Sequence, residues 1–314
     1  MRALLVALLA VTASTSVYAA DPGPPDVVPP ADAVPPADHP PEETEPPVDA
    51  PPAPAPDPGI NTAWYLGPPR WFFSTLVDLG IIYLRPRLAF GYGKPHASWI
   101  GVEANPIIST DTIGAWSGIR LAAPWLELRL GARLMHSLGR TPLQPQAAYT
   151  REDLEIRTGS SATYEAIEAE LSGSWDVGGG VNVFGEGALT YVTGVPAGMY
   201  VFEEVTKVVV DPPWIVRLRA GWTFALAFNG ALSMGPVIEA VDLPNRGKLV
   251  LRAGIVGRLK LYDDLEVRMT IAPAFGSPDS LGVRGADAFI LGVRYRWATG
   301  WSPKALPPKP PAAQ

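Results

Sequence analysis

The chain repeats one pattern: segments of about ten residues in which every second side chain is apolar. In the segment PWLELRLGARLMHSL, leucine or alanine occupies every second position from Leu126 to Leu134. The positions between them hold Glu127, Arg129, Gly131 and Arg133. Because successive side chains of a β-strand point to opposite faces, this pattern predicts a strand with one apolar and one polar face. Such a strand fits either a soluble sheet with a leucine core, or a closed sheet whose leucines face lipid.

Twelve candidate strands fill the body of the chain, and most of them alternate in this way. They are 81–92, 99–108, 113–122, 125–137, 162–175, 181–193, 199–210, 214–226, 231–241, 248–260, 264–275 and 288–298. A strand that crosses a membrane needs about 9–11 residues, whereas soluble strands most often have about 5–6. The lengths therefore favour an all-β fold, a transmembrane antiparallel up-and-down β-barrel of about 12 strands (10–14). The alternative is a secreted soluble β-sandwich that binds a partner.

One long segment conflicts with simple alternation of strands. Residues 139–161 should form an outer loop, but counting from 81–92 places them on the inner side of the membrane. An early strand near RWFFSTLVDLG, residues 70–80, removes the conflict if MYVFEEVTKVVV, residues 199–210, is an outer excursion. That arrangement also gives twelve strands.

The two ends of the chain differ in composition from its body. Residues 1–20 combine Arg2, an apolar run and small residues before a cleavage point, which predicts a secretory signal peptide. Residues 21–68 are rich in proline and acidic side chains, and we expect them to be a disordered periplasmic segment. Residues 69–301 are the expected barrel, and 302–314 are a Pro-rich tail. The Pro-rich parts could contact the cell wall or a periplasmic partner.

If the leucines face lipid, the charged positions face the lumen. An arginine at the lipid midplane would cost about 2–4 kcal/mol, so inward placement is strongly favoured. The expected lumen-lining residues are Arg85, Arg87, Glu127, Arg129, Arg133, Glu168, Glu170, Arg217, Arg219, Arg252, Arg258, Glu266, Arg268, Arg294 and Arg296. Arginine outnumbers glutamate among them, which predicts a positive lumen. It could be a narrow pore that favours anions, or an interior filled by a structural ion-pair network.

Aromatic residues gather near the ends of the candidate strands. Amphipathic rings prefer the boundary between membrane and water, so we expect two girdles. Their predicted members are Tyr92, Trp99, Trp125, Trp175, Trp214, Trp222, Trp297 and Trp301.

In these features the body resembles bacterial outer-membrane β-barrels, and turns such as LKLYDDLEV resemble the tight periplasmic turns of that class. The resemblance implies export to the outer membrane and contact with its lipid. One departure is the C-terminus. Barrels of this class usually finish on an aromatic residue, whereas RYRWATGW is followed by thirteen more residues here.

Little in the sequence points to chemistry. His136 and Ser137 are neighbours on a strand and point to opposite faces, so they do not suit a lipid-hydrolase dyad, which stays a lower alternative. Three histidines and no cysteine give little for a metal site, and we expect no cofactor. The net charge of −6 does not suggest nucleic-acid binding. The sequence therefore predicts a pore or a structural envelope protein rather than an enzyme.

Overall fold

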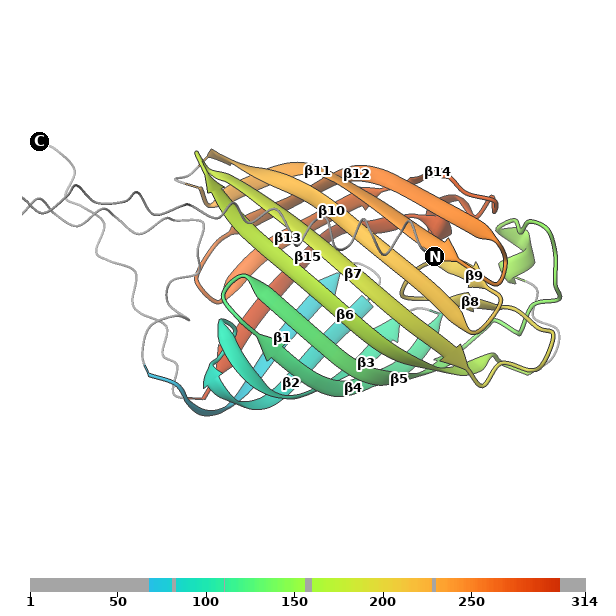
Figure 1. The fold of residues 1–314 in the computed structure, drawn as a ribbon, viewed down its shortest axis with the longest axis horizontal. Helices are drawn as coiled ribbons and strands as arrows, with labels where there is room; N and C mark the ends of the chain where they lie inside the picture. The colour runs from blue at the N-terminus through green and yellow to red at the C-terminus, as the bar shows by residue number, and fades with distance from the viewer. Residues whose placement is uncertain (1–67, 81–82, 110, 156–159, 228–229, 300–314) are drawn as a thin grey trace, which may run out of the picture. The chain divides into compact units, whose positions relative to one another are not determined.

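The computed structural model describes residues 68–80, 83–109, 111–155, 160–227 and 230–299. The predicted signal peptide, nearly all of the acidic Pro-rich segment, Trp301 and the C-terminal tail lie outside these residues. The described residues form a closed antiparallel β-barrel (Figure 1). Among them, no helix is long and apolar enough to cross a membrane.

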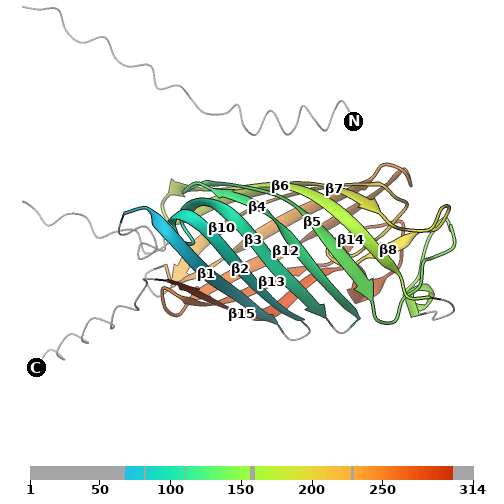
Figure 2. The same ribbon diagram turned by 90° about the horizontal axis from the view of Figure 1, so that it is seen from below.

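Twelve wall strands build the barrel in the described part of the chain. They are β1 (Arg70–Gly80), β2 (Tyr83–Lys94), β3 (Ser98–Ser109), β4 (Thr112–Ala122), β5 (Leu126–Ser137), β6 (Thr163–Gly178), β7 (Val181–Thr193), β10 (Trp214–Ala227), β11 (Leu232–Leu243), β12 (Lys248–Lys260), β13 (Leu265–Ala272) continued by β14 (Ala274–Gly276), and β15 (Asp287–Ala298). Each pairs with its neighbour along the chain, and the ring closes where β1 pairs with β15 (Figure 2).

The barrel has two unlike ends. We call the end that holds Arg70 and Ala298 the terminal end, where the connections between strands are short. One of them uses Gly178, Gly179 and Gly180, whose φ angles of 87°, 63° and 74° suit glycine. The opposite end, the loop end, carries three long connections. These are 138–162 with η1 (Glu152–Glu155), 194–213 with β8 (Val201–Glu203) and β9 (Val208–Val210), and 277–286 with η2 (Gly282–Gly285).

The predicted number of about twelve strands is confirmed, but two of the segments predicted as strands are corrected. The early strand exists as β1, and the long segment 139–161 therefore lies at the loop end together with 194–213. The candidate strand 199–210 is wrong as a wall strand, because it forms the separate β8–β9 hairpin. The candidate strand 264–275 is interrupted at Pro273, which has no N–H to donate to the ladder.

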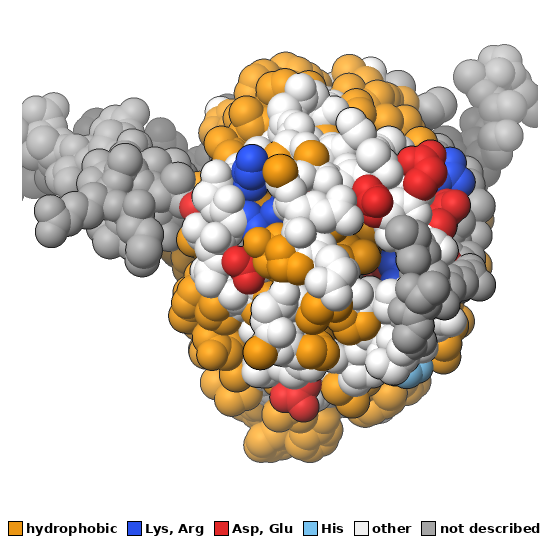
Figure 3. All heavy atoms as spheres, turned by 90° about the vertical axis from the view of Figure 1, so that its right-hand side faces the viewer, with side chains coloured by type: hydrophobic (Ala, Val, Ile, Leu, Met, Phe, Trp, Pro, Cys, Tyr) orange, Lys and Arg blue, Asp and Glu red, His pale blue; other side chains and the backbone are white. Residues whose placement is uncertain are grey.

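The faces of the wall are those of a membrane barrel. Large apolar side chains point outward and are accessible, among them Ile119 at 50 %, Leu130 at 43 % and Ile238 at 63 %. Seen from the loop end, hydrophobic side chains ring the outside, while the centre is mainly backbone and other side chains, with scattered charged and hydrophobic groups (Figure 3). Exposing such side chains to water forgoes about 1.5–3 kcal/mol each, so this surface suits hydrocarbon. The observed faces do not favour the soluble β-sandwich.

Candidate functional site

The charged side chains predicted for the lumen all lie on the inner face of the barrel. Strand pairing places them there, because each alternates with outward-facing apolar neighbours along its strand. They do not form one uniform lining, since two arcs of the wall carry different balances of charge.

The first arc, which we call the paired wall, is the inner face of β3 to β7 and β10. Arg219 of β10 pairs outside this arc, with Glu239 of β11 and Asp287 of β15; the other charged residues of the arc are Glu103, Arg120, Glu127, Arg129, Arg133, Glu168, Glu170, Glu186 and Arg217. Arg120 bridges Glu103 at 2.5 Å and Glu127 at 2.6 Å, and Arg129 bridges Glu103 at 3.2 Å and Glu170 at 3.4 Å. Arg217 continues the chain from Glu170 to Glu186. Four arginines and five carboxylates thus form a nearly neutral network.

The ring of one inward-facing tryptophan, Trp116, packs against this network. Trp116 points inward and is 2 % exposed, with the Arg129 guanidinium 4.5 Å from its ring centre. The ring fits there because Gly131 has no side chain: a Cβ on Gly131 would lie 2.5 Å from Trp116 Cζ2. The cation–π contact and the ion pairs together fix the position of Arg129.

The second arc, which we call the basic wall, is the inner face of β12, β13, β15, β1 and β2. Apart from Arg252 of β12, which pairs with Glu239 of β11, its arginines are Arg85, Arg87, Arg258, Arg268, Arg294 and Arg296. Two carboxylates pair with them among the described residues, Asp78 and Glu266, whereas Asp287 of β15 pairs instead with Arg219 of β10, at 2.6 Å. Asp78 accepts bonds from Arg294 at 2.5 and 2.9 Å and from Arg87 at 3.3 Å. Glu266 accepts from Arg268 and from Arg296. This arc therefore carries a surplus of positive charge.

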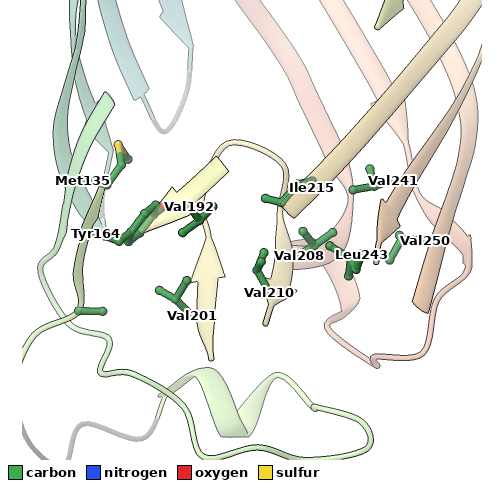
Figure 4. Close-up of a cluster of buried hydrophobic side chains, with 11 residues drawn as sticks. Met135, Tyr164, Val192, Val201, Val208, Val210, Ile215, Val241, Leu243 and Val250 are labelled. Atoms are coloured by element: carbon green, nitrogen blue, oxygen red, sulfur yellow. The ribbon is translucent and has the colours of Figure 1, made fainter. Parts of the chain in front are cut away.

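The β8–β9 hairpin lies inside the barrel at the loop end. Val201, Val208 and Val210 are at most 2 % exposed and pack against inward side chains of the wall, which come from β5 to β7 on one side and β10 to β12 on the other (Figure 4). The other face of the hairpin, with Phe202 and Val209, packs against residues of the long loops. The hairpin is thus a plug held between the wall and the loops.

Charged groups fix this plug to the wall. Glu203, in β8, is fully buried and accepts bonds from Arg133 at 2.6 Å, from the Tyr164 hydroxyl at 3.2 Å and from the Thr206 amide at 2.6 Å. Burial alone would raise the pKa of Glu203, but Arg133 and the Thr206 donors outweigh it and lower this pKa to about 2. From the other side, Arg252 donates to the Thr206 carbonyl at 2.7 Å.

A cavity of about 1770 Å³ occupies the lumen beside the plug. Its lining runs from Trp125 and Gly180 at the terminal end to Asp111 and Lys207 at the loop end. Among the described residues, ten basic and six acidic side chains line it, and the six arginines of the basic wall are all included. A charged solute in this cavity therefore meets the basic wall on one side.

The predicted aromatic girdles are only partly matched by the observed positions. Tyr92, Trp125, Trp175, Trp222 and Trp297 point outward in the half of the barrel nearer the terminal end, and Trp214 points outward near the loop end beside Tyr191. Trp99 is a correction: it is 6 % exposed and packs inside against Phe72, because its strand alternates with Trp99 on the inner face. Trp301 lies outside the described residues.

Several charged residues of the site were missed by the sequence analysis. They are Asp78, Glu103, Arg120, Glu186 and Glu203. Asp78 lies in the early strand that only the loop count suggested, and Arg120 lies in a segment that alternates poorly. The alternation around Glu103 and Glu186 carried enough signal to find both. Glu203 gave no such signal, since its role depends on a hairpin folding inward.

Neither the His136–Ser137 pair nor a metal-ligand cluster forms a site in the described residues. His136 points outward and contacts the Thr163 hydroxyl at 2.8 Å, whereas Ser137 is buried, so the two do not form a dyad. No group of three or more histidine or acidic side chains among the described residues could hold a metal ion.

Comparison with known proteins gives a likeness of fold only. No known protein-family profile matches the chain, and no curated protein matches it. Solved structures that resemble it come from outer-membrane β-barrels. They include the NanC porin (10 % identity, TM-score 0.32, 73 % of this chain and 98 % of that one). The KdgM porin in complex with disordered oligogalacturonate shares 8 % identity at a TM-score of 0.35, over 72 % of this chain and 96 % of that one. A loop-deletion mutant of OmpT, an outer-membrane protein of Vibrio cholerae, shares 9 % identity at a TM-score of 0.34, over 73 % of this chain and 99 % of that one. Identities and TM-scores this low carry no inference about function; the barrel itself places the chain in the general class of outer-membrane β-barrels.

Proposed function

We propose that the protein is a narrow diffusion pore of the outer membrane that prefers anions. The observation that carries this proposal is the surplus of arginine on the basic wall of the lumen cavity. Field lines from these charges concentrate in a lumen with low-dielectric walls, which raises the local concentration of anions and lowers that of cations. The plug occupies part of the lumen at the loop end, which brings a solute in the remaining cavity closer to these charges.

The alternative is a structural envelope barrel. It is supported by the paired wall and by the plug, which fill part of the interior with side chains and close contacts. In that case the lumen cavity would be blocked to ions, and the loops at the loop end would carry any function. Contact of the Pro-rich segments with the cell wall or a periplasmic partner is a further proposal that fits either role.

Planar-bilayer recording separates these roles. We expect purified, heat-modifiable protein to give small conductance steps in KCl, with a reversal potential displaced toward that of chloride under a salt gradient. A matched chain refolded incorrectly, recognised by its loss of heat-modifiable migration, serves as the control. Folded barrels without conductance would favour the structural role, and a reversal potential displaced toward that of potassium would contradict the anion preference.

A further inference from the structure

The wall has a break in its hydrogen bonding between β2 and β3. The ladder pairs Leu84 with Ile108 and Leu88 with Ala104, which brings Pro86 opposite Pro106. Neither proline has an N–H to donate, and no paired residues are found between these two positions. Arg85 and Arg87 flank Pro86 and project inward from this break. By the same register Arg87 stands opposite Asn105, at the distance of about 5 Å that separates facing Cβ atoms.

The inward side chains at this break have unused hydrogen-bonding atoms. Nε of Arg85, Nε of Arg87 and both polar atoms of the Asn105 amide are buried without a hydrogen-bond partner. Asn105 is fully buried, although buried amides are nearly always bonded. Leaving such groups unsatisfied costs free energy, so a ligand that accepts from the Nε–H groups or from the Asn105 amide N–H would be stabilised there.

The ion pairs at the break leave positive charge in excess, which also favours a negatively charged ligand. Arg85 makes no ion pair with any described residue, and Arg87 reaches only Asp78, at 3.3 Å. Asp78 is already engaged by two shorter bonds from Arg294, at 2.5 and 2.9 Å. Within ion-pair distance, one carboxylate thus serves Arg87 and Arg294 and none serves Arg85, while Glu103, Glu168 and Glu170 act on these arginines from beyond that distance. Both Arg85 and Arg87 line the lumen cavity.

We propose that Arg85 and Arg87, with the Asn105 amide behind them, form a saturable binding site for the carboxylate or phosphate group of a solute in the lumen. The planar fork of a guanidinium matches two oxygens of such a group, whereas chloride offers a single acceptor centre. The site rests on the proposed function only in that a solute must be able to enter the lumen. It adds selectivity among anions to the general preference for negative charge.

Binding can be measured apart from transport. In detergent micelles at constant ionic strength, inorganic phosphate is titrated and its binding followed by the ³¹P resonance, with acetate as competitor. We expect saturable binding that acetate displaces. In an Arg85→Gln/Arg87→Gln variant the half-saturating concentration should rise by about tenfold or more, because charge-assisted bonds are lost. The control is Arg151→Gln at the loop end, an exposed arginine that is bonded to Glu155 at 3.1 Å and is not among the residues lining the lumen cavity, which should change it by less than about twofold.

Two results would overturn the site: non-saturable binding in the wild type, or an unchanged half-saturating concentration in the double variant. If the double variant loses heat-modifiable migration, Asn105→Ala replaces it and should weaken binding in the same direction. Reversal potentials keep this site separate from the pore. Anion preference without saturable phosphate binding removes the site and leaves the pore, whereas saturable binding by barrels that conduct no current removes the pore and leaves the site.

Discussion

The paired wall and the basic wall are made of the same residue type on the same face of one sheet, yet they differ in what arginine does. On the paired wall each arginine bridges two carboxylates from other elements, as Arg120 of β4 lies between Glu103 of β3 and Glu127 of β5. On the basic wall the arginines share two carboxylates, and Arg85 has no ion-pair partner among the described residues.

The difference shows that pairing, rather than position in the lumen, decides the role of an arginine. A paired, desolvated guanidinium holds neighbouring strands together, and its removal leaves a buried carboxylate uncompensated. An arginine in surplus contributes little to cohesion, because it repels its neighbours, but its field extends into the lumen. The paired wall thus supports the barrel and the plug, while the basic wall sets the electrostatic character of the passage.

The largest expected effect is on the paired wall. Arg133→Gln removes the partner of Glu203 and of Glu168, at 2.6 and 2.5 Å, and leaves the fully buried Glu203 carboxylate without its counter-charge. Breaking a buried pair in this way costs about 3–5 kcal/mol. Urea titration of the heat-modifiable band in liposomes measures the free energy of unfolding. The exposed Arg151→Gln at the loop end is the control, and equal stability of both variants would contradict the comparison.

A smaller effect is expected when acid protonates Glu203 and so weakens the attachment of the plug to the wall. The pKa of Glu203 is lowered from 4.5 to about 2, so its ion pair stabilises the hairpin fully above pH 4.5. That stabilisation is lost progressively as the pH falls from 4.5 through about 2. We expect single-pore conductance to change over this window, as the hairpin loosens, and Glu203→Gln to show the acid-like conductance already at pH 7. A variant with wild-type conductance at pH 7 would show that Glu203 does not hold the plug.

The smallest effect on stability is expected on the basic wall. Arg85→Gln leaves no described carboxylate without a partner, so its free energy of unfolding should stay within about 0.5 kcal/mol of the wild type or rise slightly. The same urea titration serves here, and the reversal potential should move toward zero. A loss as large as that of Arg133→Gln would abolish the distinction between the two walls.

The sequence alone determined the barrel, a strand number of about twelve (10–14) and the face that meets lipid. The reason is that the alternation repeats every two residues within a single strand. The pattern from Leu126 to Leu134 therefore predicts which side chains share the apolar face without information about any other strand. It also placed the arginines inward, since hydrocarbon excludes them. Even the loop count, through residues 139–161, pointed to the early strand β1.

The tertiary structure decided which arginines are paired, that Trp99 and Trp116 face inward, and that the hairpin fills the loop end. These outcomes depend on residues far apart in the chain, such as Arg294 with Asp78, 216 positions away, and Arg133 with Glu203, 70 positions away. Alternation fixes the face of a side chain but not its neighbours across the barrel. Those neighbours follow from strand register and barrel closure, which no single segment encodes.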